Sequence, residues 1–197
     1  MGDIGKPTAG SGACTLVVNG IFAYFFYIYT FQNPDSGSCF AKEGNEAGYG
    51  EVPSVTSSEG DTPQEGFIDV SAKFHTWFLY GFILNCVGMG YAVFAFLYHV
   101  TESDIVKGFT NLVGCVNCCG GLAWIIAGAV FRWRFVGKVC SGDFVAEDLA
   151  VAKSEPYAWK TGKFMKIYLL LTLSILGTIC CCGAVAGIAM GATAARS

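Results

Sequence analysis

The sequence predicts an all-α fold: an integral membrane four-helix bundle with two polar loops on one face. Four apolar runs are each long enough to cross a bilayer core, which requires about 20 residues of helix. The composition is 53% hydrophobic and 14% charged. The charged share is well below the value of about 25% that is typical of soluble domains. The runs also lack the polar and apolar alternation of a membrane barrel strand. We therefore expect a single transmembrane domain over residues 1–197.

The expected elements follow in order along the chain. The four spans cover about residues 14–32, 75–100, 109–131 and 164–191. An even number of spans places both termini on one side of the membrane, and loop 1 (33–72) and loop 3 (132–163) together on the other. Loop 1 is too short and too poor in aliphatic residues to form a core of its own. No separate soluble domain is therefore expected.

Two cysteines lie clearly outside the spans. Of the ten in the chain, Cys39 is in loop 1 and Cys140 is in loop 3. Because these loops share a face, we expect a disulfide between them, which would form in an oxidising compartment. The loops would then be extracellular or lumenal and the termini cytosolic, in the plasma membrane or a secretory-pathway vesicle. The alternative is a pair of free thiols in cytosolic loops.

The charge pattern argues for the opposite orientation. Nine of the 12 lysines and arginines lie in or beside loops 1 and 3, and the positive-inside rule places such loops in the cytoplasm. The same loops also hold most of the acidic residues, so polar residues of both signs concentrate on that face. We favour cytosolic termini. The chain has no basic run, and its net charge of −3 gives no indication of nucleic-acid binding.

Small residues repeat on the fourth span. Gly183, Gly187 and Gly191 recur at four-residue spacing, and such a stripe lets another helix approach closely. The partner helix could belong to the same chain or to a neighbouring copy. We expect the protein to be a homo-oligomer or a component of a larger membrane assembly, with membrane lipids as further partners.

Two asparagines fall in the middle of neighbouring spans. Asn85 in the second and Asn117 in the third each carry an amide that needs a hydrogen-bond partner away from water. We expect them to clip the two helices together. The alternative is a polar path through a small channel or transporter, although no Asp, Glu, Lys or Arg lies at the centre of any span.

Aromatic and basic residues gather toward the face of loops 1 and 3. Trp77 is expected in an interfacial aromatic belt, where one side of the ring is apolar and the other is wet. Arg132 and Arg134 leave the third span at headgroup depth, where they would contact lipid phosphates. The alternative for these arginines is an ion pair with an acid of loop 3, namely Asp143, Glu147 or Asp148.

The remaining cysteines allow two further interpretations. Cys115 and Cys118 have the spacing of a redox dithiol, so a membrane thiol oxidoreductase is an alternative function. Neither loop offers a second cysteine pair to relay electrons, so we expect no enzyme and no cofactor. No metal site is expected, because the cysteine-rich stretches lie inside spans without histidine. Cys14 lies at the beginning of the first span, where S-acylation is a further possibility.

The architecture resembles that of the tetraspan membrane proteins, most of all the MARVEL-like ones, in its four spans, short connection Thr101–Gly108 and two loops on one face. The stretch Phe131–Arg134, followed by Gly137–Asp143, is similar to four-span proteins of ciliated protists. The chain departs from claudins, since loop 1 has one cysteine and no tryptophan, and from tetraspanins, since Cys118-Cys119-Gly120 lies inside a span. The resemblance implies a non-enzymatic structural protein that organises membrane, or a membrane protein assembly, by lateral helix packing and loop contacts.

Overall fold

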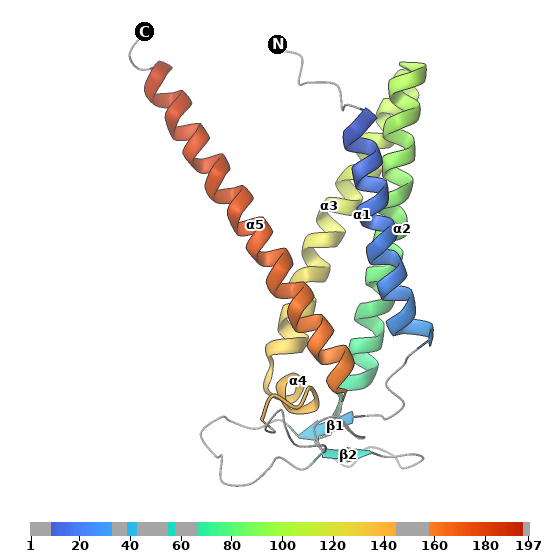
Figure 1. Cartoon of the computed structure of the whole chain (residues 1–197), viewed down its shortest axis with the longest axis vertical. Helices are drawn as coiled ribbons and strands as arrows, with labels where there is room; N and C mark the ends of the chain where they lie inside the picture. The colour runs from blue at the N-terminus through green and yellow to red at the C-terminus, as the bar shows by residue number, and fades with distance from the viewer. Residues whose placement is uncertain (1–8, 33–38, 43–54, 58–66, 145–157, 195–197) are drawn as a thin grey trace.

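The computed structural model describes residues 9–32, 39–42, 55–57, 67–144 and 158–194 (Figure 1). The helices are α1 (Ala9–Tyr27) with its π-helical continuation η1 (Ile28–Gln32), α2 (Val70–Thr101), α3 (Asp104–Trp133), α4 (Phe135–Cys140) and α5 (Trp159–Ala194). The strands are β1 (Cys39–Lys42), β2 (Val55–Ser57) and β3 (Phe67–Asp69). The long helices alternate in direction, so α1 begins and α5 ends at the same end of the molecule (Figure 1).

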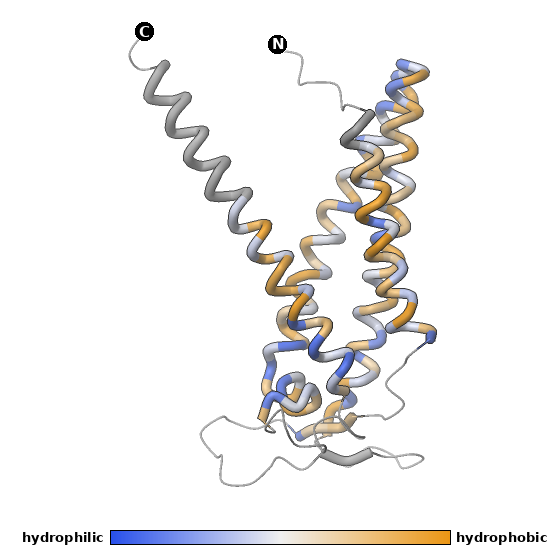
Figure 2. The backbone as a smooth tube through the Cα atoms, viewed as in Figure 1, coloured by the Kyte–Doolittle hydropathy of each residue, from blue (hydrophilic) through white to orange (hydrophobic). Residues whose placement is uncertain are grey.

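Three helical segments are long and apolar enough to cross a membrane, namely Gly12–Gln32, Val70–Thr101 and Asp104–Trp133. Each contains one of the predicted spans. Apolar residues cover most of their length, and hydrophilic residues gather toward the helix ends (Figure 2). The prediction of a mostly helical chain that fits a membrane-embedded protein is confirmed. The predicted fourth run, 164–191, lies within α5.

The helices pack unequally. α1 lies along α2, and α2 lies along α3, whereas α5 diverges from the others toward its C-terminal end (Figure 1). Met165 and Leu169 of α5 are fully buried, but from Leu170 to Thr178 every side chain except the half-buried Thr172 is exposed. The predicted four-helix bundle is therefore not confirmed, because the described side chains of α5 share a core with the other helices only over its first three turns.

A small antiparallel sheet lies beneath the helices at the loop end. Its strand order is β2-β1-β3, and Phe40 of the central strand pairs with Thr56 on one side and Asp69 on the other. β3 runs directly into α2, where the Asp69 carboxylate caps the helix by accepting a 2.9 Å hydrogen bond from the Ala72 N–H. The described part of loop 1 is thus tied to α2, a feature that its Gly-rich and Ser-rich composition did not predict.

A tight turn joins α3 to α4. Gly137 lies so close to the carbonyl oxygens of Phe131 and Arg132 that an added Cβ would overlap with both. After α4, Gly142 adopts a φ of 72°, a conformation that favours glycine. These two glycines let the chain reverse around Cys140, and they direct α4 back beneath α3.

The apolar core lies at the loop end of the helices rather than at mid-span. Its buried side chains come from every long helix and from α4, and include Phe26, Phe74, Phe78, Val136 and Met165. Phe26 is completely buried. The described contacts between α5 and the rest of the chain are made in this layer, so it is the part of the fold that sets the direction of α5.

Candidate functional site

Two tryptophans join α2 to α3 by reciprocal hydrogen bonds. The indole N–H of Trp77 donates to the backbone carbonyl of Trp124 at 3.0 Å, and the indole N–H of Trp124 donates to the carbonyl of Trp77 at 2.8 Å. The two rings stack with centroids 4.5 Å apart and planes 11° apart. We call this pair the tryptophan clasp. The expected position of Trp77 in an interfacial belt is wrong, because its side chain is 1% exposed and lies inside the helix layer.

Aromatic rings from α1 and α5 surround the clasp. Phe26 of α1 meets Trp77 and Trp124 edge-on, with centroid distances of 5.6 and 5.4 Å. Tyr168 of α5 lies 5.3 Å from Phe26 and 5.5 Å from Trp124. Edge-to-face pairs at these distances are favourable beyond their area of contact. All four long helices therefore meet at the clasp.

Two glycines make room for the clasp. A Cβ at Gly81 of α2 would lie 2.6 Å from Cζ2 of Trp124 and 2.8 Å from Cε1 of Phe26, and a Cβ at Gly128 of α3 would overlap with the indole of Trp77. Both rings are fixed by stacking and hydrogen bonds, so they cannot yield easily. Gly81 and Gly128 thus allow close packing of α2 and α3 because neither has a side chain where the indole of the other helix lies.

A disulfide joins the sheet to α4. Cys39 of β1 and Cys140 of α4 are bonded across a sequence separation of 101 residues, with their Cα atoms 5.9 Å apart. Both side chains are completely buried, and the Cys39 N–H donates to the Ser71 hydroxyl at 2.8 Å. The prediction of this disulfide is confirmed. It holds loop 1 and loop 3 together beneath the helices.

Arg132, at the end of α3, is buried and fully engaged. Its two terminal nitrogens donate to the two carboxylate oxygens of Asp143 at 2.9 and 2.8 Å, and its Nε donates to the carbonyl of Gly162 on α5 at 2.9 Å. The predicted headgroup contact is therefore wrong for Arg132, since its side chain is 1% exposed. The alternative, a pair with Asp143, is what the structure shows. Arg134 is exposed at the α3–α4 junction, and its headgroup contact stays a prediction.

Backbone contacts attach α5 to the same point. The Ala158 N–H donates to the carbonyl of Cys140 at 2.9 Å. Ser141 packs so closely on Gly162 that a Cβ there would overlap with its hydroxyl and would come 2.6 Å from its Cβ. The first turn of α5 is thus fixed to the disulfide and to Arg132, and the direction of the whole helix follows from these contacts.

A basic pocket opens between the end of α3, the turn after α4 and the first turns of α5. Its volume is about 520 Å³. One acid, Asp143, faces four cationic side chains among the described lining residues, and apolar side chains complete the wall. We call this space the basic pocket. Its cations are Arg132, Lys138, Lys163 and Lys166, and its apolar side chains are Phe144, Trp159, Ile167 and Leu170.

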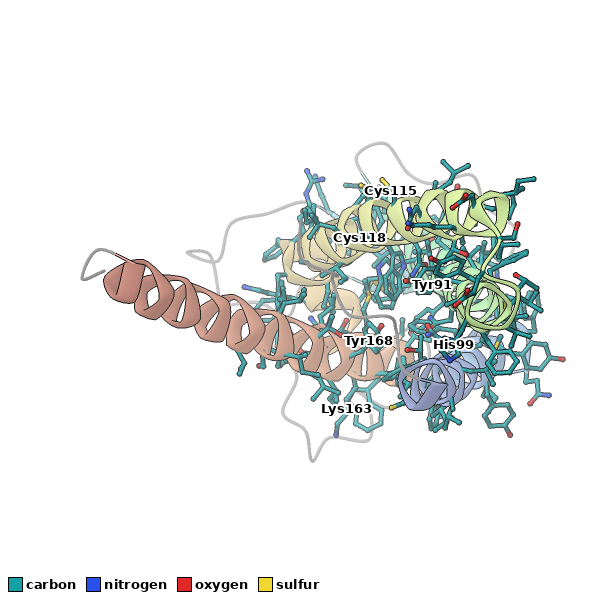
Figure 3. All side chains as sticks on the ribbon, turned by 90° about the horizontal axis from the view of Figure 1, so that it is seen from above. Tyr91, His99, Cys115, Cys118, Lys163 and Tyr168 are labelled. Carbon is teal, nitrogen blue, oxygen red and sulfur yellow. A yellow bond between two sulfur atoms is a disulfide. The ribbon has the colours of Figure 1, made fainter. Side chains whose placement is uncertain are left out.

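The two predicted asparagines do not clip the helices to each other. The Asn85 amide is 8% exposed and donates to the Gly81 carbonyl of its own helix at 2.7 Å. Asn117 is half-buried on α3, and no hydrogen bond between the two is present in the described part of the chain. Between α2 and α3, the Tyr91 ring lies 3.0 Å from a Cβ position at Gly114 and points between the helices (Figure 3).

The remaining predicted residues lie apart from this layer. Cys115 and Cys118 are free and exposed on α3 (Figure 3), and Cys14 is free and exposed on α1. The glycine stripe at residues 183, 187 and 191 lies on the last part of α5, whose side-chain surroundings are outside the described residues. Within the described ranges, no group of three or more His, Cys, Asp or Glu could hold a metal.

Comparison with known proteins adds no relative. The chain matches no protein-family model, no curated protein and no solved structure. Its function is therefore argued from its own geometry.

Three features of the tryptophan clasp and the basic pocket were not predicted. Trp124 stands alone in the middle of an apolar run, away from the interface where tryptophan is enriched, and that position was a usable signal. Lys163 and Lys166 are one helical turn apart on α5, so they share a face. Gly81 and Gly128 gave no signal of their own, because many glycines occur in these spans.

Proposed function

We propose that the chain is a non-enzymatic, four-span structural protein, of the MARVEL-like tetraspan class, that organises membrane or a membrane protein assembly. In this proposal α5 is the fourth span and makes lateral contacts with a neighbouring copy or another membrane protein. The observation that carries the proposal is the course of α5, which leaves the other helices after Leu169, with the side chains from Leu170 to Thr178 exposed except for the half-buried Thr172. A span within a closed bundle would bury one face along its whole length.

A fixed base supports a lateral role for the free part of α5. The tryptophan clasp, the Cys39–Cys140 disulfide and the buried Arg132 hold the first three turns of α5 at one angle. The rest of the helix is then presented to its surroundings without a neighbour among the described side chains. In lipid, apolar exposure alone drives no association, but small residues let two helices approach closely. The stripe Gly183, Gly187 and Gly191 supplies such a face.

The disulfide supports an orientation. A bond between Cys39 and Cys140 persists in an oxidising compartment, so we place loops 1 and 3 on the extracellular or lumenal side and both termini in the cytosol. The plasma membrane and secretory-pathway vesicles provide this arrangement. Cys14, which is exposed at the beginning of α1, would then lie on the cytosolic side, where S-acylation takes place.

The competing functions find less support. Cys115 and Cys118 are free and exposed on α3 (Figure 3), whereas Cys39 and Cys140 form a disulfide with each other. The Asn85 amide is turned toward its own helix, which does not favour a polar path past Asn117. The proposal therefore assigns no catalytic role to the first pair and no transport role to the second.

A site-specific cross-link tests the proposal. A photoreactive benzoylphenylalanine is placed at Ile175, which is 51% exposed on α5, and in a matched variant at Val116, which is 57% exposed on α3. Both positions lie about 16 residues from the loop end of their helices. After illumination of intact membranes, we expect a cross-linked protein band from Ile175 that is absent, or at least severalfold weaker, from Val116. Equal labelling of lipid alone from both positions would refute the lateral role of α5.

A further inference from the structure

The basic pocket has the charge of an anion-binding site. Lys163 and Lys166 line it together with Arg132 and Lys138, and Asp143 is the one carboxylate among the described lining residues. Arg132 already neutralises that carboxylate through two hydrogen bonds. Lys166 lies 3.7 Å from the same carboxylate, with 46% of its side chain exposed. Because Arg132 already neutralises Asp143, the described lining keeps positive charge on Lys163 and Lys166 that a bound anion would balance.

The pocket is also amphipathic. Phe144 and Trp159 line the pocket with the cations, and Ile167 and Leu170 continue its wall along α5 toward the C-terminal part of that helix. Lys163 covers the Trp159 ring, with its ammonium 4.6 Å from the ring centroid, so the rim combines a cation with an aromatic surface. Such a combination is typical of the membrane interface.

The wall of the pocket is fixed before any ligand arrives. The guanidinium of Arg132 is held by Asp143 and by the carbonyl of Gly162. Ser141, which also lines the pocket, donates to the Gly137 carbonyl at 2.7 Å and packs on Gly162. A site with a preorganised wall loses less free energy to ordering when it binds.

From these observations we propose that the basic pocket binds the phosphate headgroup of an anionic phospholipid. The phosphate lies between Lys163 and Lys166, and the acyl chains run past Ile167 and Leu170 along α5. The apolar wall favours a lipid over a soluble phosphate, because only the lipid fills both halves of the pocket. The inference rests on the proposed crossing of the membrane by α5, but it does not depend on lateral assembly.

Native mass spectrometry of the full chain in mild detergent tests the site. Dioleoylphosphatidylglycerol, dioleoylphosphatidylcholine and inorganic phosphate serve as separate probes. We expect the phosphatidylglycerol adduct to form well below the concentration required for phosphatidylcholine. The variants Lys163→Gln and Lys166→Gln should each weaken it by about fivefold, since one lysine near a membrane surface contributes about 1 kcal/mol. Lys160→Gln is the matched control, because Lys160 is exposed on the same turns of α5 but does not line the pocket.

Each contrary result overturns the assignment in a distinct way. Equal weakening by Lys160→Gln would show diffuse attraction to the basic surface instead of a site. Equal affinity for the two lipids would remove the role of charge. Binding of inorganic phosphate with the same dependence on Lys163 and Lys166, and without lipid preference, would identify a soluble anion. Loss of lipid binding while the Ile175 cross-link persists would overturn this site and leave the proposed lateral assembly intact.

Discussion

Trp77 and Trp124 each donate an indole hydrogen bond to the other's backbone carbonyl, at 3.0 and 2.8 Å, while their rings stack. Both carbonyls lie within helices, so the clasp adds interhelical bonds on top of the helical ones. A tryptophan inside an apolar span needs a partner for its N–H, and here the backbone carbonyl of the other tryptophan is that partner. The clasp fixes the register of α2 against α3 at one point.

Removing one indole donor should weaken the protein measurably. Trp124→Phe keeps a ring but loses the bond to the Trp77 carbonyl, so we expect a loss of about 1–2 kcal/mol in unfolding free energy. Detergent-induced unfolding in mixed micelles measures it. The double variant Trp77→Phe with Trp124→Phe should cost less than the sum of the single variants, because the two sites are coupled. Tyr80→Phe, at a side chain that is 58% exposed, is the control, and strict additivity would refute the clasp.

The glycine beside the clasp should not tolerate a methyl group. Gly128→Ala places a Cβ 2.7 Å from Cε2 of Trp77, and overpacking of this kind costs about 1–3 kcal/mol. Gly121→Ala, on the same helix, meets nothing within 4 Å. It should be neutral or slightly stabilising, because alanine favours a helix over glycine. The same unfolding assay compares the two, and equal effects would contradict the described packing of α3.

The buried ion pair should depend on both partners. Asp143→Asn leaves the guanidinium of Arg132 buried without its counter-ion, so we expect a loss toward the low end of about 3–5 kcal/mol, since Asp143 is partly exposed. Thermal unfolding in detergent measures the shift. Lys160→Gln, at an exposed position on α5, is the control and should leave the melting temperature nearly unchanged. An unaltered melting temperature for Asp143→Asn would rule out the structural role of the pair.

Loss of the disulfide should destabilise the loop layer. Replacing both cysteines, Cys39→Ser with Cys140→Ser, opens the covalent loop of about 100 residues that the disulfide closes. We expect a loss of roughly 2–5 kcal/mol in unfolding free energy. A reducing agent should lower the melting temperature of the native chain and leave that of the double variant unchanged. Cys14→Ser is the control. Mass spectrometry without reduction, after alkylation, should recover a linked Cys39–Cys140 peptide, and two alkylated thiols would place the loops in a reducing compartment.

The long helices and the disulfide could be predicted from sequence because each leaves a plain signal. A run of about 20 apolar residues predicts a membrane span, and two cysteines in loops on the same face predict a disulfide. The strands could not be predicted, because β1 and β3 are only four and three residues long within a Gly-rich and Ser-rich loop. Their hydrophobic pattern is too short to show a period.

The candidate site was harder to predict for a physical reason. In a membrane, lipid-facing and core-facing positions are equally apolar, so the sequence does not show which face of a helix is packed. Trp77 was therefore assigned to the interface although it is buried. The divergence of α5 could not be predicted, because its apolar run is uniform. Arg132 was placed at the headgroups because the proximity of Asp143 and Gly162 exists only after α4 reverses the chain.

The number of copies in the membrane tests the central claim most directly. The full chain, with one fluorophore at its C-terminus, is extracted with its native lipids in polymer discs, and bleaching steps are counted for single particles. The account predicts that most particles bleach in two or more steps, and that Gly187→Leu, which blocks close helix approach, shifts them to one step. Single-step bleaching of the native chain, unchanged by Gly187→Leu and without any partner protein in the discs, would contradict a role in lateral assembly.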